Sequence, residues 1–200
     1  MSPRPDVSEE RKSQILEAAI AVFARLGFQQ TRMDDIASQA GLSKGTLYLY
    51  YKSKDAVIGA LLKYFFTQEF KRLQSFLEAE RQEPIAEQII LLTRQLASAM
   101  QWMQRLMPIA FEFYALAGRD GEVRQFLQQY FKTFREALAR LIQRGIERGE
   151  FRSVDTEATA ITLTALYEGT ALLYFVDPQG LSWPEQLEFS VHSLLEGIRA

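Results

Sequence analysis

At 200 residues the chain is long for one small domain, so we expect two modules. A net charge of −2 argues against a uniformly basic nucleic-acid-binding protein, and the absence of cysteine excludes disulfides, thiolate metal sites and cysteine nucleophiles. His192 is the only histidine, which removes histidine-based metal clusters and disfavours a catalytic triad, so neither a metal nor a cofactor is expected.

Charge is distributed unevenly along the chain. Up to residue 54 there are eight Lys and Arg against six Asp and Glu, whereas the remainder holds fifteen against nineteen. A small basic head on an acidic body fits nucleic-acid contact that is confined to one end of the protein.

Apolar residues at helical spacing predict helices along nearly the whole chain, and no alternating strand pattern occurs. The first apolar stripe covers residues 15–26 and stops at Gly27. A short second helix follows at 33–40, Ser43 can cap a third, and Ser53 can cap a longer fourth. The prediction is an all-α protein of about nine helices, the later ones at roughly 84–104, 106–117, 122–148, 156–176 and 183–199.

One apolar stretch, from Ala158 to Val176, approaches the length of a membrane span, with Glu168 as its only charge. Four threonines within it and acidic residues on both flanks argue against a transmembrane helix. The N-terminal segment also lacks the apolar stretch of a secretory signal. We therefore expect a cytoplasmic protein with no membrane partner.

Residues 33–51 have the pattern of a helix-turn-helix. Gly41 permits a tight turn, and the small Ala37 lets the following helix cross closely. The seam between the two helices is apolar, with Ile36, Leu42 and Leu47. Such a unit presents the N-terminal half of its second helix, residues 44–50, to the major groove of DNA.

The side chains on and around this second helix are the candidates for DNA contact, although such a face can also be plain solvated surface. Gly45 has no side chain to hold the helix away from the DNA backbone, and Leu49 could meet a thymine methyl group. Asp34 could accept from a cytosine amine, or face water, or cap its helix. The candidate DNA-binding residues are Thr31, Arg32, Ser43, Lys44, Gly45, Thr46, Tyr48, Leu49, Tyr50, Lys52 and Lys54.

The run ILEAAIAVFARLGFQQTRMDDIASQAGLSKGTLYLYYKSKDAVIGALL, residues 15–62, resembles the DNA-binding head of the tetracycline-repressor (TetR) family. The resemblance covers about a quarter of the chain. It rests on the spacing of Phe23, Gly27 and Phe28, followed by Thr31 and by the short runs DIA and AGLSKGTLYLYYKSK. The sequence departs from the family pattern at Tyr51, which replaces the usual Phe. It implies a head at 1–54 and an effector-binding and dimerisation domain at 55–200. It also implies contacts to phosphate or sugar by Thr31, Tyr48, Tyr50 and Lys54, and to bases or backbone by Lys44 and Thr46.

The part of the chain beyond the head is rich in aromatic residues. Most of these belong in a core, but several lie on one-sided stripes with polar tips, which suits a largely apolar cavity for a small-molecule effector. The candidate lining residues are Trp102, Met103, Met107, Phe111, Tyr114, Phe126, Tyr130, Leu163, Tyr167 and Tyr174.

The last two predicted helices carry the features of a dimer interface. Small residues form a seam on the eighth helix, where another helix could approach closely, and the ninth has a matching apolar stripe. A four-helix contact between two chains, as in the family, would use Ala158, Thr162, Ala165, Gly169, Leu187, Val191, Leu194, Leu195 and Ile198. A two-fold dimer predicts a near-palindromic operator.

These features predict a ligand-responsive, DNA-binding transcriptional regulator, most simply a repressor that a small, largely apolar or aromatic effector releases from its double-stranded operator. Two alternatives stay open. One is an all-α enzyme, which the shortage of acid–base and metal-binding groups disfavours. The other is a DNA-binding protein with the same head that acts as an activator, or in a structural or cell-division role without a ligand.

Overall fold

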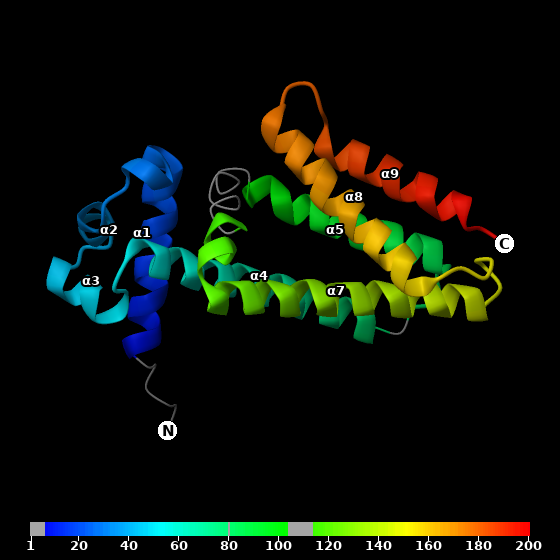
Figure 1. Ribbon diagram of the computed structural model, residues 1–200, viewed down its shortest axis with the longest axis horizontal. Coiled ribbons are helices and arrows are strands. Elements are labelled where there is room, and N and C mark those ends of the chain that lie inside the picture. The colour runs from blue at the N-terminus through cyan, green and yellow to red at the C-terminus, as the bar shows by residue number, and fades with distance from the viewer. Residues whose placement is uncertain (1–6, 80, 104–113) are drawn as a thin grey trace. The chain divides into compact units, whose positions relative to one another are not determined.

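The computed structural model describes residues 7–79, 81–103 and 114–200, and most of them are helical (Figure 1). The all-α prediction is confirmed: within these ranges the only β contact is an isolated bridge between Phe151 and Arg199. Residues 114–119 are helical too. The helices are α1 Val7–Gln30, α2 Met33–Gln39, α3 Lys44–Tyr50, α4 Lys54–Glu78, α5 Ile85–Met103, α7 Gly121–Glu147, α8 Thr156–Val176 and α9 Trp183–Gly197.

The described chain separates into two compact units. The first comprises residues 7–67 and 114–127, and the second comprises 68–103 and 128–200 apart from residue 80. Helices α4 and α7 each contribute residues to both units. This division concerns packing, and the functional boundary that we placed at residue 54 stays a prediction.

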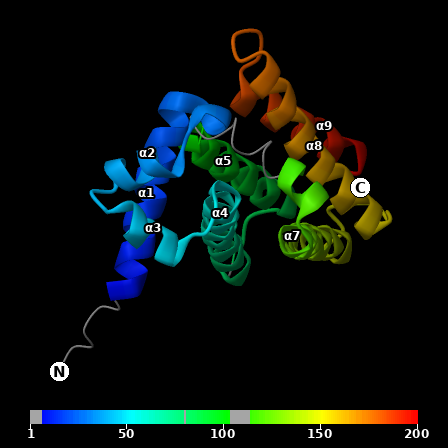
Figure 2. The ribbon, with the colours of Figure 1, turned by 60° about the vertical axis from the view of Figure 1, so that its left-hand side comes forward.

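In the first unit α2 packs against α1 and α3 packs against α2, an arrangement that Figure 2 shows. Gly27 has a φ of 73°, a left-handed value that interrupts the helical geometry of α1 at the residue where the sequence predicted its end. The apolar stripes of the three helices meet in a core that includes Ile15, Ala19, Val22, Ile36 and Leu47.

The turn between α2 and α3 is built by backbone hydrogen bonds. Leu42 N–H donates to the Ala37 carbonyl (2.9 Å) and Gly41 N–H donates to the Ser38 carbonyl (3.1 Å), which is the Schellman pattern of a helix end. Gly41 adopts the required left-handed φ of 65°. Ser43 then caps α3, because its Oγ accepts from Thr46 N–H (3.1 Å). The predicted roles of Gly41 and Ser43 are both confirmed.

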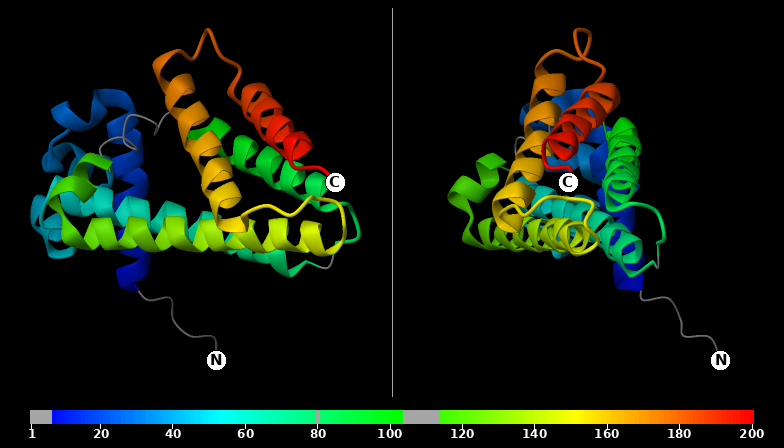
Figure 3. Two further views of the ribbon diagram at one scale, coloured as in Figure 1. Left: turned by 45° about the vertical axis from the view of Figure 1, so that its right-hand side comes forward. Right: turned by 90° about the vertical axis from the view of Figure 1, so that its right-hand side faces the viewer.

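The second unit has a core formed by the second half of α4 together with α5, α7, α8 and α9. Helix α9 packs on both α5 and α8, as Figure 3 shows. The core includes Ile89, Leu138, Ile142, Leu163 and Leu187, all fully buried. The end of the chain is fastened by two backbone bonds, from Arg152 N–H to the Ile198 carbonyl (2.9 Å) and from Ala200 N–H to the Glu150 carbonyl (3.1 Å).

Helix α8 has two apolar faces. Its inner face, with Ala160, Leu163 and Tyr167, is buried in the unit, whereas its outer face is largely exposed. By length and composition alone α8 would suffice to cross a membrane, a property that it shares with core helices of soluble proteins. Within the described residues the outer face of α8 is not covered by the rest of its unit.

Candidate DNA-binding surface and effector domain

The short helix α3 carries most of the predicted DNA-contacting residues on one accessible surface. Ser43, Lys44, Gly45 and Lys52 are exposed, and Leu49 is 76% exposed, an unusual position for a large apolar side chain. Thr46, Tyr48 and Tyr50 are half-buried. Leu47 faces the opposite way and is fully buried against the other helices of the head. Helix α3 thus has one face that is buried in the head and one face that is exposed to solvent.

Gly45 has no structural role within the protein that would require glycine. A Cβ atom at this position would meet only Ser43 Oγ, at an ordinary distance of 3.8 Å, and the backbone lies outside the left-handed region. Glycine inside a helix nevertheless lowers stability by about 0.5–1 kcal/mol relative to alanine. The packing of the described residues therefore gives no reason for glycine at this position.

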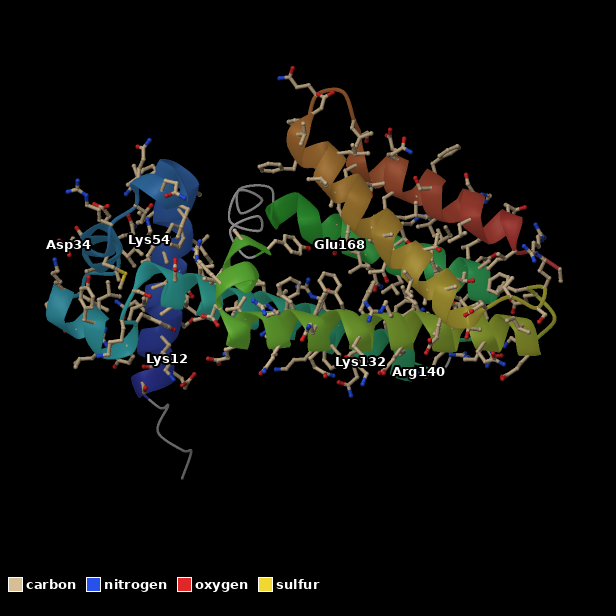
Figure 4. The ribbon with its side chains drawn as sticks, viewed as in Figure 1. Lys12, Asp34, Lys54, Lys132, Arg140 and Glu168 are labelled. Carbon is tan, nitrogen blue, oxygen red and sulfur yellow. The ribbon has the colours of Figure 1, made fainter. Side chains whose placement is uncertain are left out.

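Lys44 is held by an ion pair with α2. Its Nζ lies 2.8 Å from Asp34 Oδ1, and this hydrogen-bonded contact raises the pKa of the Lys44 ammonium. Both side chains remain largely exposed, and Asp34 is labelled in Figure 4. Because Arg32 is also exposed, the N-terminal ends of α2 and α3 together hold two cations and two carboxylates, the second being half-buried Asp35, which accepts from Arg32 N–H (2.8 Å).

Two of the residues that were predicted to contact phosphate make hydrogen bonds inside the head. Thr31 is only 2% exposed, and its hydroxyl donates to the Gly27 carbonyl (2.7 Å), so it closes the end of α1. The Lys54 ammonium donates to the carbonyls of Phe28 (2.5 Å), Gln29 (3.2 Å) and Thr31 (2.9 Å), which uses all three of its donors inside the head. Both residues act as caps. The role of Lys54 could not be seen in the sequence, because the carbonyls that it caps lie 23 to 26 residues away.

The predicted effector residues are divided between the two units. Tyr114 and Phe126 belong to the first unit, whereas Tyr130, Leu163, Tyr167 and Tyr174 belong to the second. Met107 and Phe111 lie outside the described residues, and so do the side chains of Trp102 and Met103.

Within the second unit three aromatic rings form a row. Tyr130 stacks on Phe134 with ring centres 6.3 Å apart, and Phe134 meets Tyr167 edge-on at 5.7 Å. Thr93 uses its only hydroxyl proton on the Ile89 carbonyl (2.8 Å), so Tyr167 must donate across the 2.9 Å between the two hydroxyls. Burial raises the pKa of Tyr167 to about 12. This row joins α5, α7 and α8.

The predicted dimer residues divide by helix. On α8, Ala158, Thr162 and Ala165 are exposed and Gly169 is half-buried, so the small-residue seam is accessible. The α9 stripe is a wrong assignment, since its residues pack into the core of their own unit with at most 5% exposure, except for half-buried Leu194. The buried residues are Leu187, Val191, Leu195 and Ile198.

The described residues contain no group of three side chains suited to hold a metal ion. The described residues instead form an exposed surface on α3 and an apolar helical core in each unit. Known proteins with the same features identify the class.

Residues 15–61 match the model of bacterial regulatory proteins of the tetR family, and residues 86–200 match that of the BetI-type transcriptional repressor C-terminal domain. The HTH-type transcriptional regulator YfiR of Bacillus subtilis is 33% identical over 161 residues, covering 80% of this chain and 78% of that protein.

Two solved structures share the fold. FadR of Bacillus subtilis in complex with stearoyl-CoA has a TM-score of 0.74 at 25% identity, covering 92% of this chain and 96% of that one. A transcriptional regulator of Saccharomonospora viridis in complex with choline has a TM-score of 0.84 at 21% identity, covering 96% and 99%. The chain therefore belongs to the TetR family of bacterial regulatory proteins, and it is a DNA-binding transcriptional regulator rather than an enzyme.

Proposed function

We propose that the protein is a repressor that binds a near-palindromic operator as a homodimer and leaves it when a small effector binds the second unit. The observation that carries the DNA-binding part is the outer face of α3. There Gly45 serves no internal purpose and Leu49 is left in solvent. Both residues are explained if α3 enters a major groove, where Leu49 can contact a thymine methyl group.

The match of residues 86–200 to a repressor C-terminal domain supports repression over activation. A regulator that acts on bacterial DNA works in the cytoplasm, which is the location that we propose.

An effector that is largely apolar or aromatic is supported by the aromatic row of Tyr130, Phe134 and Tyr167. Stearoyl-CoA and choline are the ligands of the two proteins of similar fold, and they differ so much in chemistry that neither can be carried over. The effector would act by shifting α4, whose residues belong to both units. Typical couplings of this kind are about 1–3 kcal/mol.

The dimer is supported by the outer face of α8. Besides its small residues this face carries Ile161 (54% exposed), Leu173 (60%) and Val176 (73%), and Phe189 of α9 is 68% exposed. Contiguous exposed apolar surface of this kind usually marks an interface. A second copy of α8 could lie against the seam at Ala165 and cover these side chains.

The experiment that tests the function begins with selection of bound fragments from a random DNA pool, followed by footprinting of the selected site. We expect two half-sites in inverted orientation, contacted on one face of the duplex. Compounds are then screened for release of that operator. Failure to select any sequence would contradict the function, whereas selection without release by any compound would favour a regulator or structural protein that needs no ligand.

A further inference from the structure

An ion pair joins α2 to α3 on the exposed surface of the head. The Lys44 ammonium lies across the Asp34 carboxylate, with its Nζ 2.8 Å from Oδ1 and 2.9 Å from Oδ2. The Asp34 side chain is 57% exposed and that of Lys44 is 62% exposed. An ion pair as exposed as this one adds little to stability, so the fold alone gives little reason for it.

The structure removes one of the three roles that the sequence left open for Asp34. The capping role at the start of α2 belongs to Asp35, whose Oδ2 accepts from Arg32 N–H (2.8 Å). Asp34 instead bonds Lys44, ten residues further along the chain. A carboxylate on a surface that approaches DNA repels phosphates, which weakens binding unless the carboxylate itself contacts a base.

Both members of the pair keep hydrogen-bonding capacity for a partner outside the chain. Among the described residues, the contacts between them are the only hydrogen bonds of the two charged groups. An ammonium has three donors and a carboxylate has about four acceptor positions, and the pair uses at most two of each. Gly45, next to Lys44, has no side chain that would keep a base edge away. The head therefore presents an anionic acceptor beside a cationic donor.

One base pair offers the complementary pattern in the major groove. Cytosine presents its N4 amino donor there, and the guanine opposite presents two acceptors, O6 and N7. Aspartate accepts from cytosine N4, and lysine donates to guanine O6 and N7. An A·T pair also has a donor, adenine N6, but its thymine offers only O4, beside a methyl group. The ion pair thus matches C·G best.

We propose that Asp34 and Lys44 together read one C·G base pair in each half of the operator. Asp34 accepts from cytosine N4 and also holds the Lys44 ammonium where it can donate to the guanine. The inference rests on the proposed entry of α3 into a major groove, and it adds the identity of one base pair. Without Asp34, the same lysine would be free to contact a phosphate at any sequence.

The test begins with selection of bound fragments from a random DNA pool by the wild-type protein, by Asp34→Ala and by the control Glu136→Ala. Glu136 pairs with Lys132, which Figure 4 labels, on an exposed surface of α7 in the second unit. One position of each wild-type half-site should prefer cytosine by about tenfold or more over any other base. Asp34→Ala should lose the preference at that position alone, and Glu136→Ala should keep it.

Modified bases in the selected operator then test the two contacts separately. Cytosine is replaced by 2-pyrimidinone, which lacks the N4 amino group, or guanine by 7-deazaguanine, which lacks the N7 acceptor. We expect 2-pyrimidinone to weaken wild-type binding about tenfold while Asp34→Ala binds both operators equally. In the same way, 7-deazaguanine should weaken binding of the wild-type protein severalfold but not that of Lys44→Ala. Equal wild-type affinity for operators with cytosine and with 2-pyrimidinone would overturn the inference.

The remaining outcomes separate the inference from the proposed function. If the wild-type protein selects no sequence, the proposed function fails and the inference fails with it. If Asp34→Ala selects the wild-type operator with every preference intact, only the assignment of Asp34 is wrong. Loss of preference at all positions by Asp34→Ala, together with a lower unfolding temperature, would show that Asp34 maintains the structure of the head. That result would also overturn the inference.

Discussion

The ammonium group of Lys54 contacts Phe28 twice, since it donates to the Phe28 carbonyl oxygen and lies 4.3 Å from the centre of the Phe28 ring. Together with the bonds to Gln29 and Thr31, this contact ties the first residue of α4 to the end of α1. Figure 4 labels Lys54 within the head. A lysine that seemed suited to clamp DNA instead stabilises the protein that carries the recognition helix.

Replacement of Lys54 by Met should therefore lower the free energy of unfolding by about 1–3 kcal/mol, because carbonyl groups at the end of α1 lose their donor. Urea unfolding measures this loss. The salt dependence of operator binding should keep its slope. The control is Lys52→Met, since Lys52 is exposed and, among the described residues, bonds the Tyr48 carbonyl alone (2.7 Å). It should leave stability nearly unchanged and reduce the slope by about 0.9 per head if Lys52 meets a phosphate.

Gly45→Ala should stabilise the free protein by up to about 1 kcal/mol, because the added Cβ has room and alanine favours the helix. Gly45→Leu should abolish operator binding if DNA approaches as closely as we propose. Gly41→Ala is the contrasting control, because its left-handed φ of 65° makes a side chain costly even where no atom is near. Thermal unfolding measures the effect on stability, and operator titration measures the effect on DNA binding. A Gly45→Leu protein that binds the operator with wild-type affinity would contradict a close approach of DNA to α3.

Asp34→Asn should strengthen binding to any DNA sequence and steepen its salt dependence by about one unit of slope, since it removes a carboxylate and releases Lys44 toward phosphates. Fluorescence anisotropy with non-operator DNA at several salt concentrations measures the change. Glu136→Gln, an exposed carboxylate of the second unit that pairs with Lys132, should have no such effect. Weaker non-specific binding by Asp34→Asn would show that Asp34 itself positions the DNA-contacting groups.

Ala165→Arg should split the dimer, because it would bury an unpaired charge at the contact between the two copies of α8, a cost of several kcal/mol. Sedimentation should show a monomer, and operator binding should fall strongly without any change near α3. Gln143→Arg adds the same charge at an exposed position of α7 and should remain dimeric. A wild-type protein that sediments as a monomer at micromolar concentration would rule out the proposed interface.

Tyr167 should make stability depend on pH at the alkaline end. Burial holds its pKa at about 12 in the folded protein, above the usual value of 10, so the folded state keeps a proton that the unfolded state loses. Stability is therefore fully present below pH 10 and should decline by about 1.4 kcal/mol per pH unit between 10 and 12. Tyr167→Phe should lack this component and should cost about 1 kcal/mol at neutral pH through the lost bond to Thr93. Urea unfolding of both proteins across this range measures the difference.

The parts of the fold that could be predicted from the sequence are those decided by neighbouring residues. Gly27 and Gly41 indicate left-handed backbone at the ends of helices, and Ser43 indicates a helix cap. These roles could be predicted because each involves residues within one helical turn. The pairing of Lys44 with Asp34 and the capping of α1 by Lys54 could not be predicted, since they join residues 10 to 26 positions apart.

The second unit illustrates a different limit. The apolar stripe of Leu187, Val191 and Leu195 correctly indicated that α9 must be covered, but periodicity does not state whether the cover comes from the same chain or a second one.

The use of cations inside the head also bears on how the protein finds its operator. The ammonium of Lys54 is held at the end of α1 and Lys44 shares its charge with Asp34, so attraction of α3 to arbitrary DNA depends mainly on the exposed Arg32 and Lys52. Sliding along the chromosome depends on that sequence-independent attraction. We therefore expect short dwell times on non-operator DNA, a search dominated by free diffusion through the nucleoid, and operator occupancy that changes little as intracellular potassium rises and falls.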